Sequence, residues 1–296
     1  QERACYILQM YLPDFTAEDI KSCVYGAYNQ NSFDSPEVAP LREIIPGLNI
    51  LELWHGPTCA FKDMALQMLP HLLTLSVSKN GEHDEIVILV ATSGDTGKAA
   101  LEGFKDVKGT RIIVFFPRDG VSEVQKRQMI TQEGNNVSVA AVKGNFDDAQ
   151  NGVKNIFASE RVVKTLADSH MKMSSANSIN WGRLLPQIVY YVSSYLDILA
   201  AGKKAGEPVN VVVPTGNFGN ILAAYYARQM GVPIKKLICA SNSNNVLTDF
   251  LRTGIYNRNR HFYKTMSPSM DILISSNLER LLHEITDDAE KVSAWL

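Results

Sequence analysis

The chain has 296 residues, of which 45% are hydrophobic and 20% charged, and its formal net charge is -2 at pH 7. These values are ordinary for a globular protein, and the length is sufficient to bury a sizeable core. The charge balance excludes the strong basic field that attracts nucleic acid or a membrane surface, so we expect neither as a partner. Any anion that binds must be held by local geometry.

Cysteine and histidine spacing argues against disulfide and metal chemistry. The four cysteines form no CxxC pair, which fits a reducing compartment, and the six histidines show no HExxH or HxH spacing, so no metal site is expected. No apolar run reaches the roughly 20 residues of a spanning helix, and no signal peptide is visible, so we expect a cytoplasmic protein. The first residue is Gln1, and we expect the sequence to be a piece of a longer one.

Hydrophobic patterning predicts an α/β fold. Thr16 is expected to cap a helix over 16–28, and the Gly-Pro turn before Lys62 predicts a helix over 59–69, capped by Thr58 and kinked or stopped near Pro70. Further strands are expected at 86–90, 111–116, 137–142, 209–213 and 236–240. Further helices are expected at 98–104, 123–131, 145–158, 181–200 and 221–230. This alternation predicts βαβ units and a largely parallel sheet, with a domain boundary near the polar stretch 174–180.

The segment His55-Gly-Pro-Thr-Cys-Ala-Phe-Lys62-Asp63 is the most informative of the chain. It places one lysine in the first turns of a predicted helix. The positive end of a helix and burial both lower the pKa of an ammonium group, and an easily neutralised amine can attack an aldehyde. The alternative is an exposed helix lysine, with Asp63 a first-turn carboxylate.

Two further loops have the character of anion sites. Thr92-Ser-Gly-Asp-Thr-Gly97 joins a predicted buried strand to a helix, where amides and hydroxyls converge at the helix N-terminus. It is not a nucleotide P-loop, because Thr92 stands where that motif needs glycine and Ala99 where it needs Ser or Thr. Gly216-Asn-Phe-Gly-Asn220 also joins a strand to a helix, and its glycines allow close backbone approach to a phosphate. A simple tight turn is the alternative for the loop from Thr92 to Gly97.

Together with Ser175-Ala-Asn-Ser-Ile-Asn180, these motifs resemble threonine synthase, in order along about two-thirds of the chain. The resemblance implies the α/β pyridoxal-phosphate-dependent type II fold, which is tryptophan synthase β-like. That fold has two α/β domains with parallel or mixed sheets and the cofactor, pyridoxal 5'-phosphate, between them. It also implies conversion of O-phospho-L-homoserine and water to L-threonine and phosphate by γ-elimination and β-hydration.

The resemblance assigns roles by position. Lys62 would be the catalytic Schiff-base lysine, Asp95 would lie near the phenolic oxygen of the cofactor, and the segment 216–220 would bind the cofactor phosphate. The residues of that segment are Gly216, Asn217, Phe218, Gly219 and Asn220. For substrate binding the expected residues are Thr92, Ser93, Thr96, Ser178, Asn180 and Arg183.

The resemblance also divides the chain into three parts. Residues 1–85 would form an N-terminal helical segment and the start of the large cofactor-binding domain, which carries Lys62. Residues 86–180 would form a smaller α/β domain. Residues 181–296 would form the remainder of the large domain, incomplete at its C-terminus. The oligomeric state cannot be read from the sequence.

Other functions stay open at this point. A related phospholyase would eliminate phosphate and release 2-oxobutyrate instead of adding water to the intermediate. A non-catalytic protein that binds pyridoxal phosphate would carry the same motifs without turnover. A nucleotide-binding α/β protein would share the fold alone.

Overall fold

The computed structural model describes residues 1–92, 94–118 and 120–295. The chain divides into two compact units, Gln1–Pro186 and Gln187–Leu296. The boundary falls inside helix α9 (Trp181–Ala200), next to Pro186. The three-part division predicted from the sequence remains a prediction.

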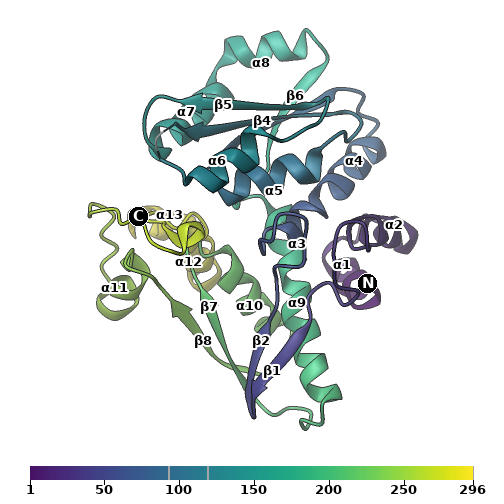
Figure 1. Cartoon of the computed structure of the whole chain (residues 1–296), viewed down its shortest axis with the longest axis vertical. Helices are drawn as coiled ribbons and strands as arrows, with labels where there is room; N and C mark the ends of the chain where they lie inside the picture. The colour runs from purple at the N-terminus through teal and green to yellow at the C-terminus, as the bar shows by residue number, and fades with distance from the viewer. Residues whose placement is uncertain (93, 119, 296) are drawn as a thin grey trace. The chain divides into compact units, whose positions relative to one another are not determined.

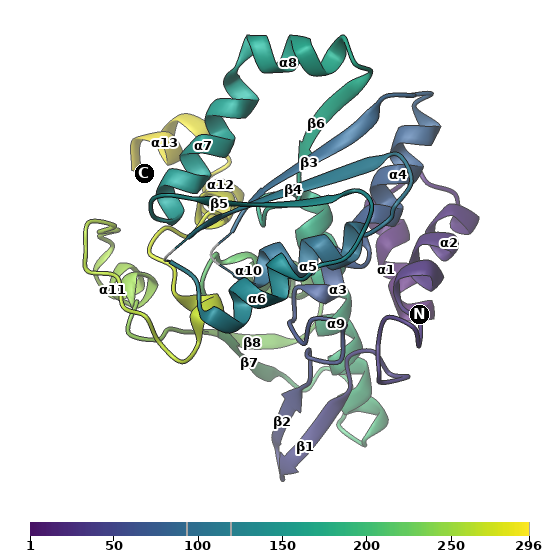
Figure 2. The same cartoon turned by 45° about the horizontal axis from the view of Figure 1, so that its top comes forward.

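A four-stranded parallel sheet forms the centre of the first unit (Figure 2). Its order is β5-β4-β3-β6, and all three pairings are parallel. The strands are β3 (Glu85–Ala91), β4 (Thr110–Pro117), β5 (Val137–Val142) and β6 (Met171–Ser175). Strand β3 is buried along nearly its whole length, because helices cover both faces of the sheet.

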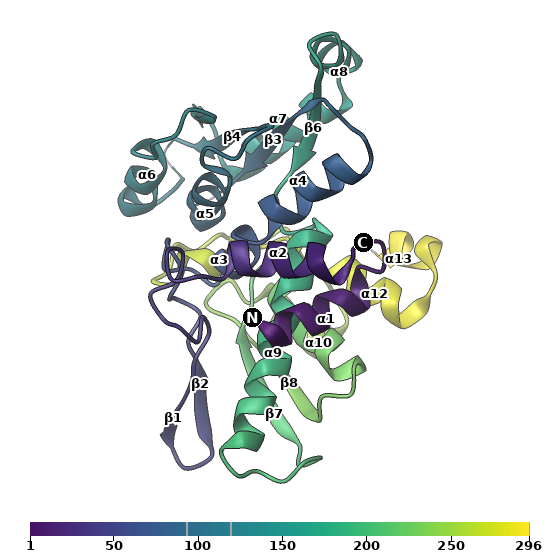
Figure 3. The ribbon, with the colours of Figure 1, turned by 90° about the vertical axis from the view of Figure 1, so that its right-hand side faces the viewer.

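Alternate residues of β3 belong to two separate cores. Ile86, Ile88 and Val90 pack with α5 (Asp95–Phe104) on one face. Val87 and Leu89 pack on the other face with residues of α7 (Phe146–Ala158). The remaining crossover helices are α6 (Glu123–Ile130) and α8 (Glu160–Ala167). Figure 3 shows α5 and α6 together on one side of the sheet.

The residues before the sheet contain helices and one hairpin. Helices α1 (Glu2–Tyr11) and α2 (Ala17–Ala27) pack side by side (Figure 3), and Thr16 caps α2 as predicted. Strands β1 (Leu41–Ile45) and β2 (Leu48–Leu51) form an antiparallel hairpin that the sequence reading did not include (Figure 1).

The predicted helix over 59–69 is wrong. The chain instead forms α3 (Asp63–Leu66), with Lys62 at its N-cap, and then α4 (Leu69–Lys79). Pro70 lies in the first turn of α4, where a missing N–H is tolerated, so the break predicted near Leu69 is present. The side chain of Thr58 binds Asp63 instead of capping a helix that begins at Cys59.

The second unit contains a two-stranded parallel sheet of β7 (Val209–Pro214) and β8 (Ile234–Ala240). Helix α10 (Gly219–Gln229) connects the strands. The elements that follow are α11 (Val246–Thr253), the 3₁₀ turn η1 (Pro268–Met270), α12 (Leu278–Thr286) and α13 (Ala289–Trp295). None of the helices in the described part of the chain combines the length and apolar character needed to cross a bilayer.

The packing of α5 on α3 generates a stability prediction. A Cβ added at Gly103 would lie 2.1 Å from the carbonyl oxygen of Leu66, whereas one added at Gly152 in α7 would meet open space. We therefore expect Gly103→Ala to lower the free energy of unfolding by about 1–3 kcal/mol, because backbone must move. Gly152→Ala should instead raise it by roughly 0.5–1 kcal/mol. Urea unfolding of both variants measures this, and equal effects would contradict the close approach.

Candidate active site

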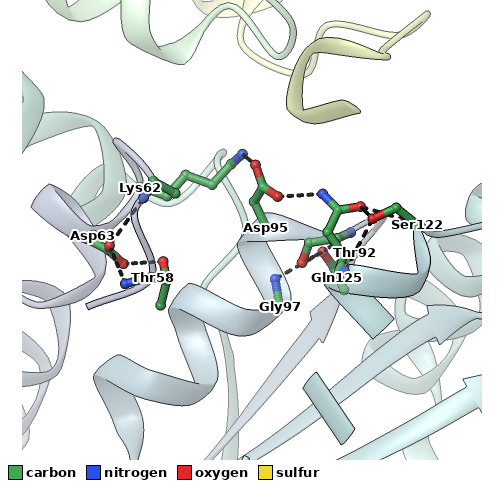
Figure 4. Close-up of polar contacts among 10 residues, drawn as sticks. Thr58, Lys62, Asp63, Thr92, Asp95, Gly97, Ser122 and Gln125 are labelled. Carbon is green, nitrogen blue, oxygen red and sulfur yellow. Dashed lines mark hydrogen bonds and ion pairs between the residues drawn. The ribbon is translucent and has the colours of Figure 1, made fainter. Parts of the chain in front are cut away.

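Lys62 is held by a tight turn at the start of α3. The carboxylate of Asp63 closes this turn: its Oδ1 accepts from the Thr58 hydroxyl at 2.7 Å, and its Oδ2 accepts from the Thr58 and Ala60 N–H groups at 2.9 and 3.4 Å. Gly56 permits the approach, since a Cβ there would lie 2.5 Å from the Asp63 Cβ. Asp63 is therefore a structural residue of the turn that presents Lys62 (Figure 4).

Lys62 is buried, with 8% of the surface of the residue exposed. Its Nζ lies 3.5 Å from Oδ2 of Asp95 and 5.0 Å from the ring centroid of Phe61. Burial lowers the pKa of the Lys62 ammonium; the charge of Asp95 opposes this, and the Arg183 guanidinium adds to the lowering. A neutral, nucleophilic amine is consequently more accessible here than on a surface lysine.

Thr92 organises the turn between β3 and α5. Its hydroxyl accepts from the N–H groups of Gly94 and Gly97, each at 3.0 Å, and donates to the carbonyl of Gly94 at 3.1 Å. The Thr92 hydroxyl is thus engaged inside the turn. Ser93, predicted to bind substrate, lies outside the described residues. Thr96 belongs to the first turn of α5.

The segment after β6 lies beside this turn. The Asn177 amide donates to the carbonyl of Ala91, the last residue of β3, at 2.9 Å. Asn180 donates to the carbonyl of Ser175 at 2.7 Å and accepts from the Gly182 N–H at 2.8 Å. Ser178 lies between them in the same segment.

Arg183 is buried as well, with only 2% of its surface exposed. Its Nη1 donates to the carbonyl of Ala176 at 2.6 Å, and burial lowers the pKa of the guanidinium to about 10. The first unit thus brings together Lys62, Asp95 and the Thr92 turn. The Arg183 guanidinium belongs to the same set, because its charge acts on the Lys62 amine. The substrate-binding roles assigned from the sequence stay predictions.

The segment 216–220 lies in the second unit, where it follows β7 and includes the first two residues of α10. Ser275 donates its hydroxyl to the carbonyl of Gly216 at 2.6 Å, and Asn277 donates both its N–H and its amide to the carbonyl of Asn217. Phe218 adopts a left-handed conformation with φ 66° at the N-cap of α10. The first N–H groups of a helix have no acceptor within it, so this turn can present donors to an anion.

The glycines of this turn cannot carry side chains easily. A Cβ at Gly216 would lie 3.1 Å from Ile272, and one at Gly219 would lie 3.3 Å from the amide of Asn277. The Asn220 amide oxygen accepts from the hydroxyls of Tyr190 and Tyr191, the latter at 2.7 Å. The sequence did not identify the side chains that bind this segment, because only their hydrogen bonds reveal that role. These side chains are Ser275, Asn277, Tyr190 and Tyr191.

Residues 46–295 match the family described as pyridoxal-phosphate dependent enzymes. The chain belongs to this family, whose cofactor is pyridoxal 5'-phosphate. The tryptophan-synthase-like type II fold predicted from the motifs is confirmed by a solved structure of threonine synthase from Brucella melitensis with pyridoxal phosphate bound. Its TM-score is 0.87 at 42% identity over 99% of this chain.

Curated relatives extend the resemblance to threonine synthase. The threonine synthase of Saccharomyces cerevisiae is 42% identical over 94% of this chain. The human protein threonine synthase-like 1 is 47% identical over 95% of this chain. The chain spans 61% of the Brucella chain, 54% of the yeast enzyme and 39% of the human protein.

His55, at the start of the lysine segment, joins two parts of the first unit. Its Nδ1 lies 2.6 Å from the Asp34 carboxylate and its Nε2 lies 2.8 Å from the Glu52 carboxylate. The hydrogen bond to Glu52 is the main cause of a raised His55 pKa, and Asp34 contributes in the same direction. The protonated ring therefore ties the residues before the lysine turn to both carboxylates.

A pH dependence follows from this arrangement. Because the folded-state pKa of His55 is raised, its contribution to stability is complete below the unfolded-state value near 6.5 and is lost as pH rises through the folded-state value. We expect the difference in unfolding free energy between the parent and His55→Asn to be larger at about pH 6 than at about pH 9. Urea titrations at both pH values measure it, and a difference that grows with pH would refute the assignment.

Proposed function

We propose that this protein catalyses the threonine synthase reaction, which converts O-phospho-L-homoserine and water to L-threonine and phosphate. The observation that carries the proposal is the buried Lys62 amine beside Asp95, at the position where the sequence motifs of threonine synthase carry their reactive lysine. The family membership and the 40–44% identity to three fungal threonine synthases and one from Pseudomonas aeruginosa support it.

Each of the two units, taken by itself, offers one group that pyridoxal phosphate needs. The cofactor needs an amine with a lowered pKa for its aldehyde, and Lys62 has that property because of burial. It also needs a site for a phosphate, and the segment 216–220 leads into the N-terminus of α10, where Phe218 at the N-cap supplies no capping side chain to the first N–H groups. We assign Lys62 to the aldehyde and the residues Gly216, Asn217, Phe218, Gly219 and Asn220 to the phosphate.

Pyridoxal phosphate supplies an electron-accepting ring that stabilises negative charge next to the amino-acid nitrogen. In the proposed reaction Lys62 is the proton carrier. Its amine takes the proton from Cα of the substrate, gives it up, and then takes one from Cβ, so that phosphate can leave Cγ. A proton is returned to Cγ, the hydroxyl of water adds at Cβ, and a proton is returned to Cα to give threonine, while the remaining proton of water leaves with the phosphate. A lowered pKa suits an amine that must both accept and release protons near neutrality.

Substrate recognition is assigned to the turn at the start of α5 and to the segment after β6. We assign Thr92, Ser93 and Thr96 to the substrate carboxylate, and Ser178, Asn180 and Arg183 to its phosphate. The hydrogen bonds of Thr92 and Asn180 support a positioning contribution, because their side chains fix the backbone of the two segments to which they belong.

A second function stays open beside the threonine synthase reaction. Four relatives named threonine synthase-like 1 share 46–47% identity with this chain, compared with 40–44% for the threonine synthases. Because that name states no reaction, the alternative is the one that the sequence left open: a phospholyase that eliminates phosphate and releases 2-oxobutyrate without adding water at Cβ.

Product analysis separates these functions. Incubation of the protein with pyridoxal phosphate and O-phospho-L-homoserine should release phosphate and threonine in equal amounts. Release of phosphate with 2-oxobutyrate in place of threonine would establish the phospholyase. Bound cofactor without release of phosphate would show that the protein binds pyridoxal phosphate without catalysing either reaction.

The same assay tests the role of Lys62. Lys62→Ala should abolish the visible absorbance of lysine-bound cofactor and lower kcat by at least about 1,000-fold, because the amine acts in several proton transfers. Lys98→Ala is the matched control, since that lysine lies in α5 and pairs with Glu102 at 3.1 Å. Retention of the absorbance band in Lys62→Ala would overturn the assignment.

A further inference from the structure

Gln125 is a buried side chain that none of the roles above uses. It lies on α6, and 6% of its surface is exposed. Its Oε1 accepts from the hydroxyl and the N–H of Ser122 at 3.0 and 3.4 Å, while its Nε2 donates to Oδ1 of Asp95 (Figure 4). A backbone N–H only donates, so the contact with Ser122 identifies the oxygen end of the amide and leaves the nitrogen for Asp95.

The Gln125 amide also packs against the turn that begins α5. A Cβ added at Gly94 would lie 2.4 Å from both Cδ and Nε2 of Gln125. The backbone of the turn and the amide are thus in direct contact, and Gly94 adopts φ 153°, which side chains rarely permit. The Gln125 side chain consequently has little freedom to turn away from Asp95.

The two oxygens of Asp95 have different neighbours. Oδ1 accepts from Gln125, and Oδ2 lies 3.5 Å from the Lys62 amine. We propose that Gln125 is a positioning residue for Lys62: by binding one oxygen of Asp95, it keeps the other facing the lysine amine. This inference rests on the proposed function only where it treats Lys62 as the reactive amine.

The charge relation between Asp95 and Lys62 gives the proposal a measurable consequence. Burial lowers the pKa of Lys62, and the nearby Asp95 charge partly opposes that effect. If Asp95 loses the hydrogen bond from Gln125, its carboxylate can turn away from Lys62. The negative charge that raises the Lys62 pKa then lies farther from the amine, which becomes neutral at a lower pH. The loss of Gln125 should therefore act on Lys62 through Asp95.

The experiment follows the reactivity of Lys62 in the full 296-residue chain after removal of bound cofactor. Lysines are labelled with trace acetic anhydride over a pH series. Mass spectrometry of the Lys62 peptide then gives the midpoint, which is the pH at which half of the Lys62 amine is neutral. Gln125→Met, which keeps the size but removes the donor, should lower this midpoint by on the order of half a pH unit. Gln128→Met on the same helix is the control and should leave it unchanged.

A double-variant cycle tests whether the effect passes through Asp95. Asp95→Asn alone should lower the midpoint, and adding Gln125→Met to it should produce no further shift. An unchanged midpoint in Gln125→Met, or an equal shift in the Asp95→Asn background, would overturn the proposal. If Gln125→Met does not fold, as judged by thermal unfolding, Gln125→Asn replaces it, since its shorter side chain withdraws the donor.

This readout is independent of the proposed reaction. Labelling measures the amine without cofactor or substrate, so a protein that makes no threonine can still show the predicted shift. Conversely, threonine production with an unchanged midpoint in Gln125→Met would leave the proposed function intact and exclude the positioning role.

Discussion

The burial of one lysine amine beside one carboxylate is the constraint on which the rest of the first unit depends. Taking an ammonium group out of water is costly unless a partner compensates, and Asp95 at 3.5 Å from Lys62 is that partner. Two separate turns must hold these residues. Asp63 closes the first around Thr58, and Thr92 closes the second with the N–H groups of Gly94 and Gly97.

The parallel sheet explains why these turns meet. Loops at the carboxyl ends of neighbouring parallel strands gather at one edge of a sheet, where α/β proteins bind their ligands. Strands β3 and β6 are neighbours, so the Thr92 turn and the segment after Ser175 lie together, joined by the bond from Asn177 to Ala91. Helix α6 adds a further contact to the Thr92 turn's helix, α5, through the hydrogen bond from Gln125 to Asp95.

Much of this arrangement could be predicted from the sequence where a signal is local. The strand at 137–142 and the helix at 181–200 have the predicted bounds, because each is a continuous apolar or periodic run. The hairpin of β1 and β2 was missed, since most of its residues are exposed and lack a buried face. The helix predicted to begin at Cys59 was wrong because the Asp63 carboxylate organises the preceding residues into a turn.

The candidate site could also be predicted only where its signal is local. Lys62 and the three candidate loops could be predicted from motifs, since each motif is contiguous. Gln125 could not be found, because its contact with Asp95 joins residues 30 positions apart and no spacing rule connects them. Strand β6 was also missed: it occupies part of the polar stretch read as a domain boundary, and its pairing with β3 gives it a place in the sheet.

The central claim is that the amine of Lys62 is the attachment point of the cofactor. Borohydride reduction of the protein loaded with pyridoxal phosphate, followed by peptide mapping, tests it most directly. The account predicts one pyridoxyl group per chain, on the peptide that contains Lys62. A modified peptide that carries any other lysine, or no stable modification at all, would contradict it.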